Sequence, residues 1–105
     1  MSSDALSSSQ RKYLRGLGHS LDPIIHIGRA GLSESVLASL DQALGQHELI
    51  KIRFLDHRGK KRELCADIEE KLRAEVAGIV GHVAILYRQA RDPEKRRLRL
   101  PKSPN

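Results

Sequence analysis

The stretch Pro23–Phe54, PIIHIGRAGLSESVLASLDQALGQHELIKIRF, decides the fold. Its first five residues, Pro23–Ile27, are a proline followed by mainly β-branched side chains, and this pattern predicts a short strand. A helix should follow from the N-cap Ser33 to about Gly45, on an apolar face formed by Val36, Leu37, Leu40 and Leu44. From Glu48 to Phe54, alternation predicts a second strand, which buries Ile50, Ile52 and Phe54 and turns Leu49, Lys51 and Arg53 the other way.

Flanking segments extend this pattern in both directions. Ser7 and Gln10 have capping-box spacing, so a helix should run from Ser8 to Leu17 and stop at Gly18. After a turn at 56–59, a third helix is expected on a stripe formed by Leu64, Cys65, Ile68 and Leu72. Gly78–His82 and Val83–Arg88 resemble a strand hairpin, and Leu98 and Leu100 could form a short extended segment.

The expected order is therefore α-β-α-β-α-β-β, a single-domain α/β sandwich. Strands separated by helices predict crossover connections, parallel pairing and helices packed on the sheet. A chain of 105 residues has the size of one domain. We divide it into a flexible N-terminus (1–5), a folded domain (6–90) and a basic C-terminal tail (91–105).

Positive charge is concentrated in short segments. The net charge is +6 with a pI near 9.9, and residues 51–62 and 88–105 each carry +5, while 32–50 and 63–87 each carry −3. Single lysines and arginines usually belong to a solvated surface, but clustering of this kind favours a polyanionic partner, nucleic acid or an acidic membrane face.

Several classes of protein are disfavoured. The N-terminus lacks the apolar core of a secretory signal, and the longest uncharged, mostly apolar stretch, Val76–Tyr87, is far shorter than the roughly 20 residues of a spanning helix. The single Cys65 excludes an internal disulfide and multi-cysteine metal sites. We therefore expect a cytoplasmic protein.

Catalytic and metal-binding patterns are not found. The five histidines (19, 26, 47, 57 and 82) have no helical zinc spacing, and neither a phosphate-binding P-loop nor a Gly-x-Gly-x-x-Gly motif occurs. Cys65 falls on an apolar stripe, where a thiol is usually inert. We expect no enzyme activity, no cofactor and no metal.

The loop formed by Gly28, Arg29, Ala30 and Gly31 is the strongest candidate site. It joins a strand to a capped helix, its glycines allow close backbone approach, and Arg29 adds a positive charge beside the helix N-terminus. The Gly-x-x-Gly loop of KH-type modules clamps a nucleic-acid backbone in this way. Residues 78–81 share the spacing but have apolar middle residues before a strand, so we interpret them as strand and turn.

Further cations extend this candidate nucleic-acid-binding surface. Aromatic residues make up 3% of the chain, which disfavours recognition by base stacking and leaves contacts to the nucleic-acid backbone. Cations expected to flank the loop are Arg11, Lys12, Arg15, Lys51 and Arg53. An electrostatic arm is possible at Arg96, Arg97, Arg99 and Lys102.

Three ordered motifs resemble the CRM domain family. They are Leu14-x-x-Leu17-Gly18-His19, Pro23–Ile25 running into Gly28–Leu32, and His47–Ile52. The chain is most similar to free-standing bacterial members of the YhbY type, over about residues 6 to 90. Gly18 departs from the alanine usual in the family, and the tail from Arg88 to Asn105 is longer and more basic than the family core.

The resemblance implies a fold similar to the C-terminal domain of translation initiation factor three, with a four-stranded mixed sheet and three helices. It also implies binding to ribosomal RNA, association with precursors of the large ribosomal subunit, no known catalysis, and an RNA-contacting loop at 28–31 with basic strand residues at Lys51 and Arg53.

Other functions stay open at this point. One is a non-catalytic interaction module that binds the ribosome or another acidic partner. An RNA-modifying enzyme would need an acid–base pair that the sequence does not display, and DNA binding is disfavoured because no helix-turn-helix is visible. We expect a monomer.

Overall fold

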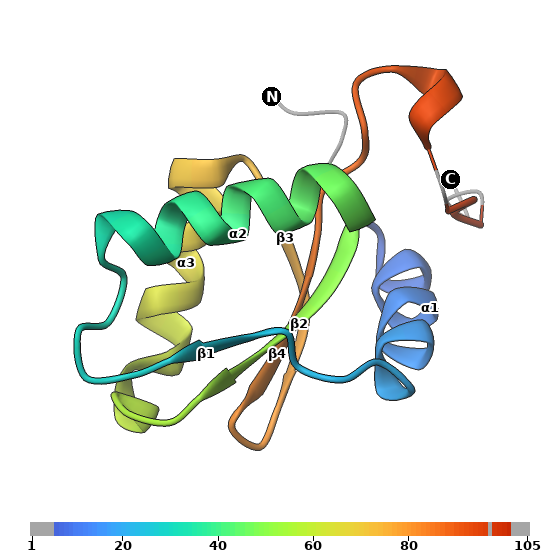
Figure 1. Cartoon of the computed structure of the whole chain (residues 1–105). Helices are drawn as coiled ribbons and strands as arrows, with labels where there is room; N and C mark the ends of the chain where they lie inside the picture. Colours follow the sequence, from blue (N-terminus) through green and yellow to red (C-terminus); the bar gives the residue numbers. More distant parts are fainter. Residues whose placement is uncertain (1–5, 97, 102–105) are drawn as a thin grey trace.

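A computed structural model gives the structure of the chain and describes residues 6–96 and 98–101 (Figure 1). The expected element order is confirmed. Two short 3₁₀ turns, η1 and η2, accompany it. The elements are α1 (Ser8–His19), β1 (Ile25–Ile27), α2 (Glu34–His47), β2 (Leu49–Phe54), η1 (Arg58–Lys60), α3 (Lys61–Leu72), β3 (Glu75–Val80), β4 (Val83–Tyr87) and η2 (Pro93–Lys95).

The four strands form one mixed sheet in the order β1-β2-β4-β3. β1 pairs with β2 in parallel, with Ile25 opposite Ile52 and Ile27 opposite Phe54. β4 pairs antiparallel with both β2 and β3. Parallel pairing, expected from the helical connections, is therefore limited to β1 and β2, because the tight turn after β3 sends β4 back between β2 and β3.

Both faces of the sheet are covered by helices. Figure 1 shows α2 and α3 on one side and α1 on the other. Under α2 and α3 lies the larger core, which includes Ile52, Phe54 and Ile68. Under α1 lies a second cluster, where Leu14 and Ile85 pack together with Leu49. The expectation that Leu49 lies on an open face is therefore wrong, because α1 covers that end of β2.

Two helices continue beyond the glycines at which they were expected to end. α1 runs through Gly18, where a Cβ would come within 2.8 to 3.0 Å of the Ile85 side chain. Gly18 therefore serves a close helix–sheet contact and is not a helix stop. α2 runs through Gly45 to His47 and closes at Glu48, whose φ is +59° and whose side chain is buried.

Strand β3 begins at Glu75, three residues earlier than expected. A register shift between Val76 and Gly78 marks a β-bulge. The bulge interrupts the alternation of inward and outward residues by which a strand is recognised in sequence. As expected, Gly78 lies in the strand and Gly81 in the turn, where its φ is +60°.

The segment after β4 folds back on the domain. The buried Glu48 carboxylate accepts the N–H of Ala90 (2.6 Å) and the N–H of Leu98 (3.2 Å). Leu98 and Leu100 adopt no strand, but their side chains pack against the cluster under α1. The Gln10 side chain donates to the carbonyl of Pro101 (2.9 Å).

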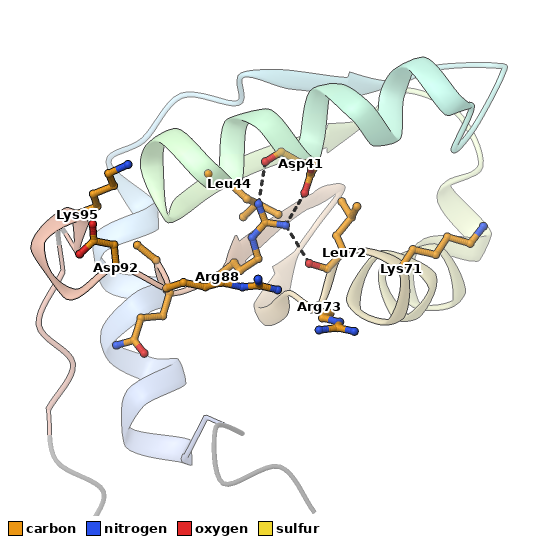
Figure 2. A pocket seen from close by; sticks show the side chains of 12 residues that line it. Asp41, Leu44, Lys71, Leu72, Arg73, Arg88, Asp92 and Lys95 are labelled. Atoms are coloured by element: carbon orange, nitrogen blue, oxygen red, sulfur yellow. Dashed lines mark hydrogen bonds and ion pairs between the residues drawn. The ribbon is translucent and has the colours of Figure 1, made fainter.

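Arg88, the first residue after β4, ties α2 to the end of α3 (Figure 2). Its guanidinium donates to Oδ1 of Asp41 (2.7 Å), to the Asp41 carbonyl (2.9 Å) and to the Leu72 carbonyl (3.0 Å). None of the helices in the described part of the chain is both long and apolar enough to cross a membrane.

Candidate nucleic-acid interface

The loop at 28–31 is a tight turn on the surface. The Gly31 N–H donates to the Gly28 carbonyl (3.0 Å), and Gly31 has a φ of +64°, which L side chains rarely adopt. Arg29 and Ala30 between them are exposed. A Cβ on Gly28 would meet open space, so this side of the loop is open to a ligand. Directly after the loop, Ser33 caps α2 by accepting the Val36 N–H (3.2 Å).

A second segment, 55–57, holds the loop in place through hydrogen bonds. The N–H groups of Leu55 and Asp56 both donate to the carbonyl of Ile27, at 2.9 and 3.2 Å. The Nε2 atom of His57 lies 2.8 Å from the Arg29 carbonyl oxygen, within hydrogen-bond distance. His57 itself has a φ of +56°. The shape of the loop therefore depends on residues that follow β2.

Cations gather where the loop meets the start of α3 and the β3–β4 turn. The Lys61 ammonium donates to the Gly81 carbonyl and lies 3.3 Å from Nδ1 of His82. The His82 carbonyl in turn accepts the Phe54 N–H (2.7 Å). Three segments thus converge at the carboxyl ends of β1 and β2. We call this surface the basic end and define it by Arg29, Arg53, His57, Arg58, Lys60, Lys61, Arg62 and His82.

Electrostatics at the basic end favour an anion. Desolvation, followed by the positive charges of Lys61 and Arg58, lowers the pKa of His82 below its usual range. Lys60 and Arg62 are exposed, and no ion pair involves either side chain among the residues the structure describes. A phosphate at this surface would relieve repulsion among neighbouring cations.

The two predicted cations of β2 have different surroundings. Arg53 is exposed and pairs in register with His26, two residues before the loop, which places it in the basic end. The Lys51 ammonium instead donates to the carbonyls of Leu21 (2.9 Å) and His19 (3.4 Å) and fixes the chain after α1.

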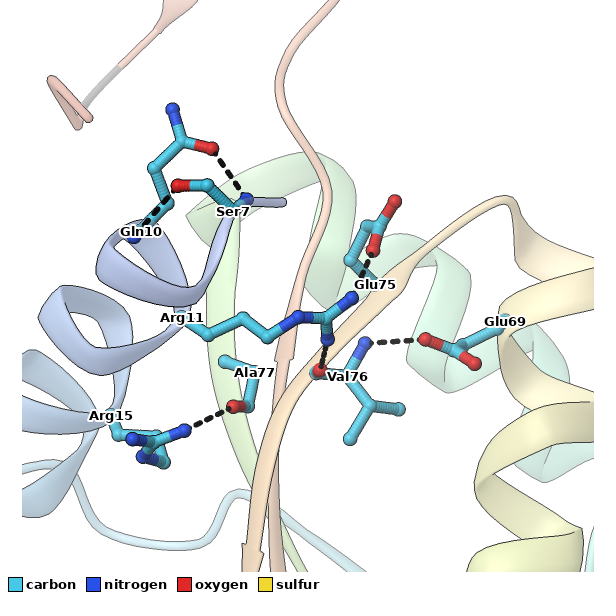
Figure 3. Close-up of polar contacts among 8 residues, drawn as sticks. All are labelled: Ser7, Gln10, Arg11, Arg15, Glu69, Glu75, Val76 and Ala77. Atoms are coloured by element: carbon cyan, nitrogen blue, oxygen red, sulfur yellow. Dashed lines mark hydrogen bonds and ion pairs between the residues drawn. The ribbon is translucent and has the colours of Figure 1, made fainter. Parts of the chain in front are cut away.

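Two of the three predicted cations of α1 are bound to β3, at the sheet edge farthest from the loop (Figure 3). Arg11 donates to the Val76 carbonyl (2.6 Å) and lies 3.5 Å from the Glu75 carboxylate. Arg15 donates to the Ala77 carbonyl (3.4 Å). Together with Glu69, which accepts the Val76 N–H (2.8 Å), they satisfy polar groups of an edge strand. The structure does not bring Arg11, Lys12 and Arg15 to the loop.

The predicted arm starts on an anchored segment. Arg96 is exposed and donates from Nε to the Ala90 carbonyl (2.9 Å), and Arg99 is exposed between the two packed leucines. Arg97 and Lys102 lie outside the described residues.

Sequence reasoning missed most of the basic end. It named Arg29 and Arg53 but not His57, Arg58, Lys60, Lys61, Arg62 or His82. For the missed lysines and arginines, the +5 charge of residues 51–62 was the available signal. The contact of this segment with the loop could not be predicted from the sequence, because it depends on the pairing of β1 with β2.

A metal-binding cluster is not assembled in the described ranges 6–96 and 98–101. They hold no cluster of three or more His, Cys, Asp or Glu suited to a metal ion. Burial, and secondarily the Glu69 charge, raise the pKa of the Cys65 thiol to about 11, so it stays protonated near neutral pH. The surface is suited to binding by charge and backbone shape.

Comparisons with known proteins agree with this description. An "RNA-binding protein" of Haemophilus influenzae is 38% identical over 99 residues, which cover 92% of this chain and 96% of the relative. A "Probable RNA-binding protein" of Pseudomonas aeruginosa is 36% identical and covers 87% and 88% of the two chains. A Staphylococcus aureus protein of known solution structure, described as "a putative RNA binding protein", superposes with a TM-score of 0.77 at 33% identity, over 91% of this chain and 99% of that one. Residues 6–88 match the family model of the CRS1/YhbY (CRM) domain, and the chain belongs to this family.

Proposed function

We propose that this protein is a non-catalytic RNA-binding protein that holds the RNA backbone at its basic end. The observation that carries the proposal is the exposed turn at Arg29 and Ala30, which is supported by His57 and lies beside cations without ion-pair partners in the described chain. Backbone amides and guanidinium groups at one surface can bind successive phosphates. The names of the relatives support RNA as the partner.

The surface favours backbone contacts over base stacking. Phe54 and Tyr87 are buried, and Tyr13 lies on α1, so the basic end presents no phenylalanine, tyrosine or tryptophan ring. Affinity should then depend steeply on salt and weakly on base sequence.

Ribosomal RNA is the class of RNA that we propose, with a role in assembly of the large ribosomal subunit in the cytoplasm by a monomeric protein. The resemblance to YhbY-type proteins supports this finer statement. Crosslinking in cells, followed by sequencing of the bound RNA, would test it. Recovery of mainly messenger or transfer RNA would contradict it.

The loop itself is tested with Arg29→Glu/Ala30→Asp. Both positions are exposed, whereas Gly31 has a positive φ and faces His57, so a substitution there would also strain the fold. Fluorescence anisotropy with a labelled 20-nucleotide single-stranded RNA should show that Kd rises at least about tenfold, since charge-assisted hydrogen bonds contribute roughly 1.5–3 kcal/mol each.

A matched control carries the same change in net charge elsewhere. Ser9→Glu/Ser20→Glu/Ser39→Glu alters exposed positions in α1, directly after α1 and in α2. Its affinity should fall by less than about threefold, because distant exposed charges are screened. Equal losses in both variants would show that overall charge, not the loop, determines binding.

The rival function, a module that binds an acidic protein, predicts a different result. Partners captured from a lysate by the full chain should then survive RNase treatment. We expect RNase to release ribosomal proteins together with the RNA.

A further inference from the structure

A second basic site lies at the other end of the molecule. A cavity of about 700 Å³ opens between the C-terminal halves of α2 and α3 and the segment after β4 (Figure 2). Its apolar floor includes Leu44, Leu72 and Ala90. Five cations line it, namely Lys71, Arg73, Arg88, Arg91 and Lys95, against two carboxylates, Asp41 and Asp92.

The wall of this cavity is fixed in place. Arg88 binds Asp41 and the Leu72 carbonyl and so joins α2 to α3. The Ala90 N–H is held by the Glu48 carboxylate (2.6 Å), and the Ala90 carbonyl is held by Arg96 (2.9 Å). A ligand would therefore meet a surface that needs little reorganisation, which favours affinity.

Both carboxylates are already engaged. Asp41 pairs with Arg88, and Asp92 accepts the Glu94 N–H (3.0 Å) as the cap of η2. Lys71, Arg73, Arg91 and Lys95 have no ion pair within the described chain. In Figure 2, Lys71 and Lys95 flank the cavity on two sides and Arg73 lies between them. Five cations against two carboxylates leave a net charge of +3 around this cavity, which favours an anionic occupant.

Helix ends alone do not account for these cations. Lys71 and Arg73 do lie at the C-terminus of α3, where positive charge stabilises the helix dipole. The Leu72 carbonyl, however, is already bound by Arg88. Arg91 and Lys95 belong to no long helix, so the dipole does not explain their position.

We propose that this cavity is a second phosphate-binding site and that it takes a further segment of RNA. The inference rests on the proposed function for its ligand class, but it concerns a separate surface. The basic end adjoins Phe54, at the end of β2, whereas Arg88 donates its N–H to the Glu48 carbonyl just before β2 begins. The two sites are thus separated by the length of β2, roughly 17 Å at about 3.3 Å per residue.

Two sites on opposite ends let one protein hold two RNA segments at a set separation. A single site would only attach the protein to RNA. Two sites would also constrain RNA folding, and binding at the second becomes intramolecular once the first is occupied.

The test uses backbone amide NMR shifts of the ¹⁵N-labelled full chain. The probes are a ten-nucleotide oligouridylate and, separately, inorganic pyrophosphate. The variant is Arg73→Glu/Arg91→Glu, and the matched control is Arg73→Lys/Arg91→Lys. Arg73 has a φ of +54°, and both variants place an unbranched side chain there, so the backbone cost is the same in each.

In the wild type, oligouridylate should shift the amides of Arg73, Ala90 and Arg91 as well as those of Arg29 and Ala30. The Glu variant should lose the cavity shifts and keep the loop shifts, and its affinity for a 40-nucleotide RNA should fall about threefold to tenfold. The Lys control should retain both sets of shifts.

Other outcomes separate the two proposals. Saturation of the loop shifts without movement at the cavity would overturn the second site and leave the proposed function intact. Cavity shifts with pyrophosphate alone would show a site for small phosphates and refute the RNA inference. Shifts at the cavity but not at the loop would support the second site and contradict the loop as the primary one.

Discussion

The imidazole of His57 lies with Nε2 2.8 Å from the carbonyl oxygen of Arg29. This contact joins two loops that are 28 residues apart in sequence, and both loops follow the parallel strands β1 and β2. The Gly-x-x-Gly turn is therefore not an independent motif. Its backbone is positioned by a residue that sequence analysis did not associate with it.

Removal of the His57 ring should weaken RNA binding with little effect on the fold. His57→Asn suits this position because asparagine tolerates a positive φ. One neutral hydrogen bond contributes about 0.5–1.5 kcal/mol, so Kd should rise about twofold to tenfold in the anisotropy assay. His19→Asn, at an exposed residue of α1, is the control. Unchanged affinity in the His57 variant would show that the contact between His57 and Arg29 is not needed for RNA binding.

Neutralising the start of α3 should reduce the salt dependence of RNA binding. Each phosphate contact contributes about −0.7 to the log–log slope on single strands, so Lys60→Gln/Arg62→Gln should make the slope shallower by about 1.4. Affinity measured between 50 and 200 mM KCl gives the slope. Lys12→Gln tests the exposed cation of α1 in the same way, and a larger effect there would shift the interface to α1.

Gly18→Ala should destabilise the protein, whereas Gly16→Ala in the same helix should not. A Cβ at 18 would lie 2.8–3.0 Å from atoms of Ile85, and a Cβ at 16 would meet open space. Overpacking costs about 1–3 kcal/mol, while alanine gains up to about 1 kcal/mol in an open helix position. Urea unfolding measures both. Equal stability of the two variants would show that the Ile85 contact relaxes without cost, and Gly18→Ala/Ile85→Val should recover part of the loss.

Loss of the Arg11 side chain should affect stability more than RNA binding. Arg11→Gln removes the donor to the Val76 carbonyl on edge strand β3, at a cost of about 1–2 kcal/mol. Urea unfolding and RNA anisotropy are measured on the same preparation. A tenfold loss of affinity at unchanged stability would show that Arg11 contacts RNA directly.

The pH dependence of stability should carry a contribution from Cys65. Burial raises its pKa to about 11 from an ordinary value of 9.0, so the folded state keeps the proton longer than the unfolded state does. Stability is then fully present below pH 9 and falls as the pH rises toward 11. The difference in unfolding free energy between wild type and Cys65→Ala should narrow by about 2 kcal/mol between pH 8 and pH 10.5. A difference in unfolding free energy that does not change with pH would contradict the raised pKa of Cys65.

Much of the secondary structure could be predicted because its signals are local. The side chains of Ser7 and Ser33 cap the helices that they were expected to begin. The helix ends were less predictable. Gly18 stays within α1 and lies against Ile85, 67 residues later, and α2 ends at Glu48, whose carboxylate binds the returning tail. A glycine or a glutamate does not indicate in sequence which distant group it will meet.

The candidate site, too, could be predicted from the sequence only in part. Sequence pattern alone determined the turn at 28–31, because two glycines, a cation and a capped helix are all contiguous. The sequence could not show which of the cations expected around this turn are available to a ligand. Arg11, Arg15 and Lys51 resemble Lys60 and Arg62 in the printed sequence, yet the first three are bonded to backbone carbonyls.

The sequence by itself thus determined the elements, their order, the basic character and the loop, all of which depend on neighbours within a few residues. Only the tertiary structure decided which cations are available to a ligand, why Leu49 is buried, and how two basic surfaces come to lie at opposite ends of β2. The reason is physical. A charge is free or engaged according to the groups that packing places within about 4 Å of it, and the pairing of distant strands sets those groups.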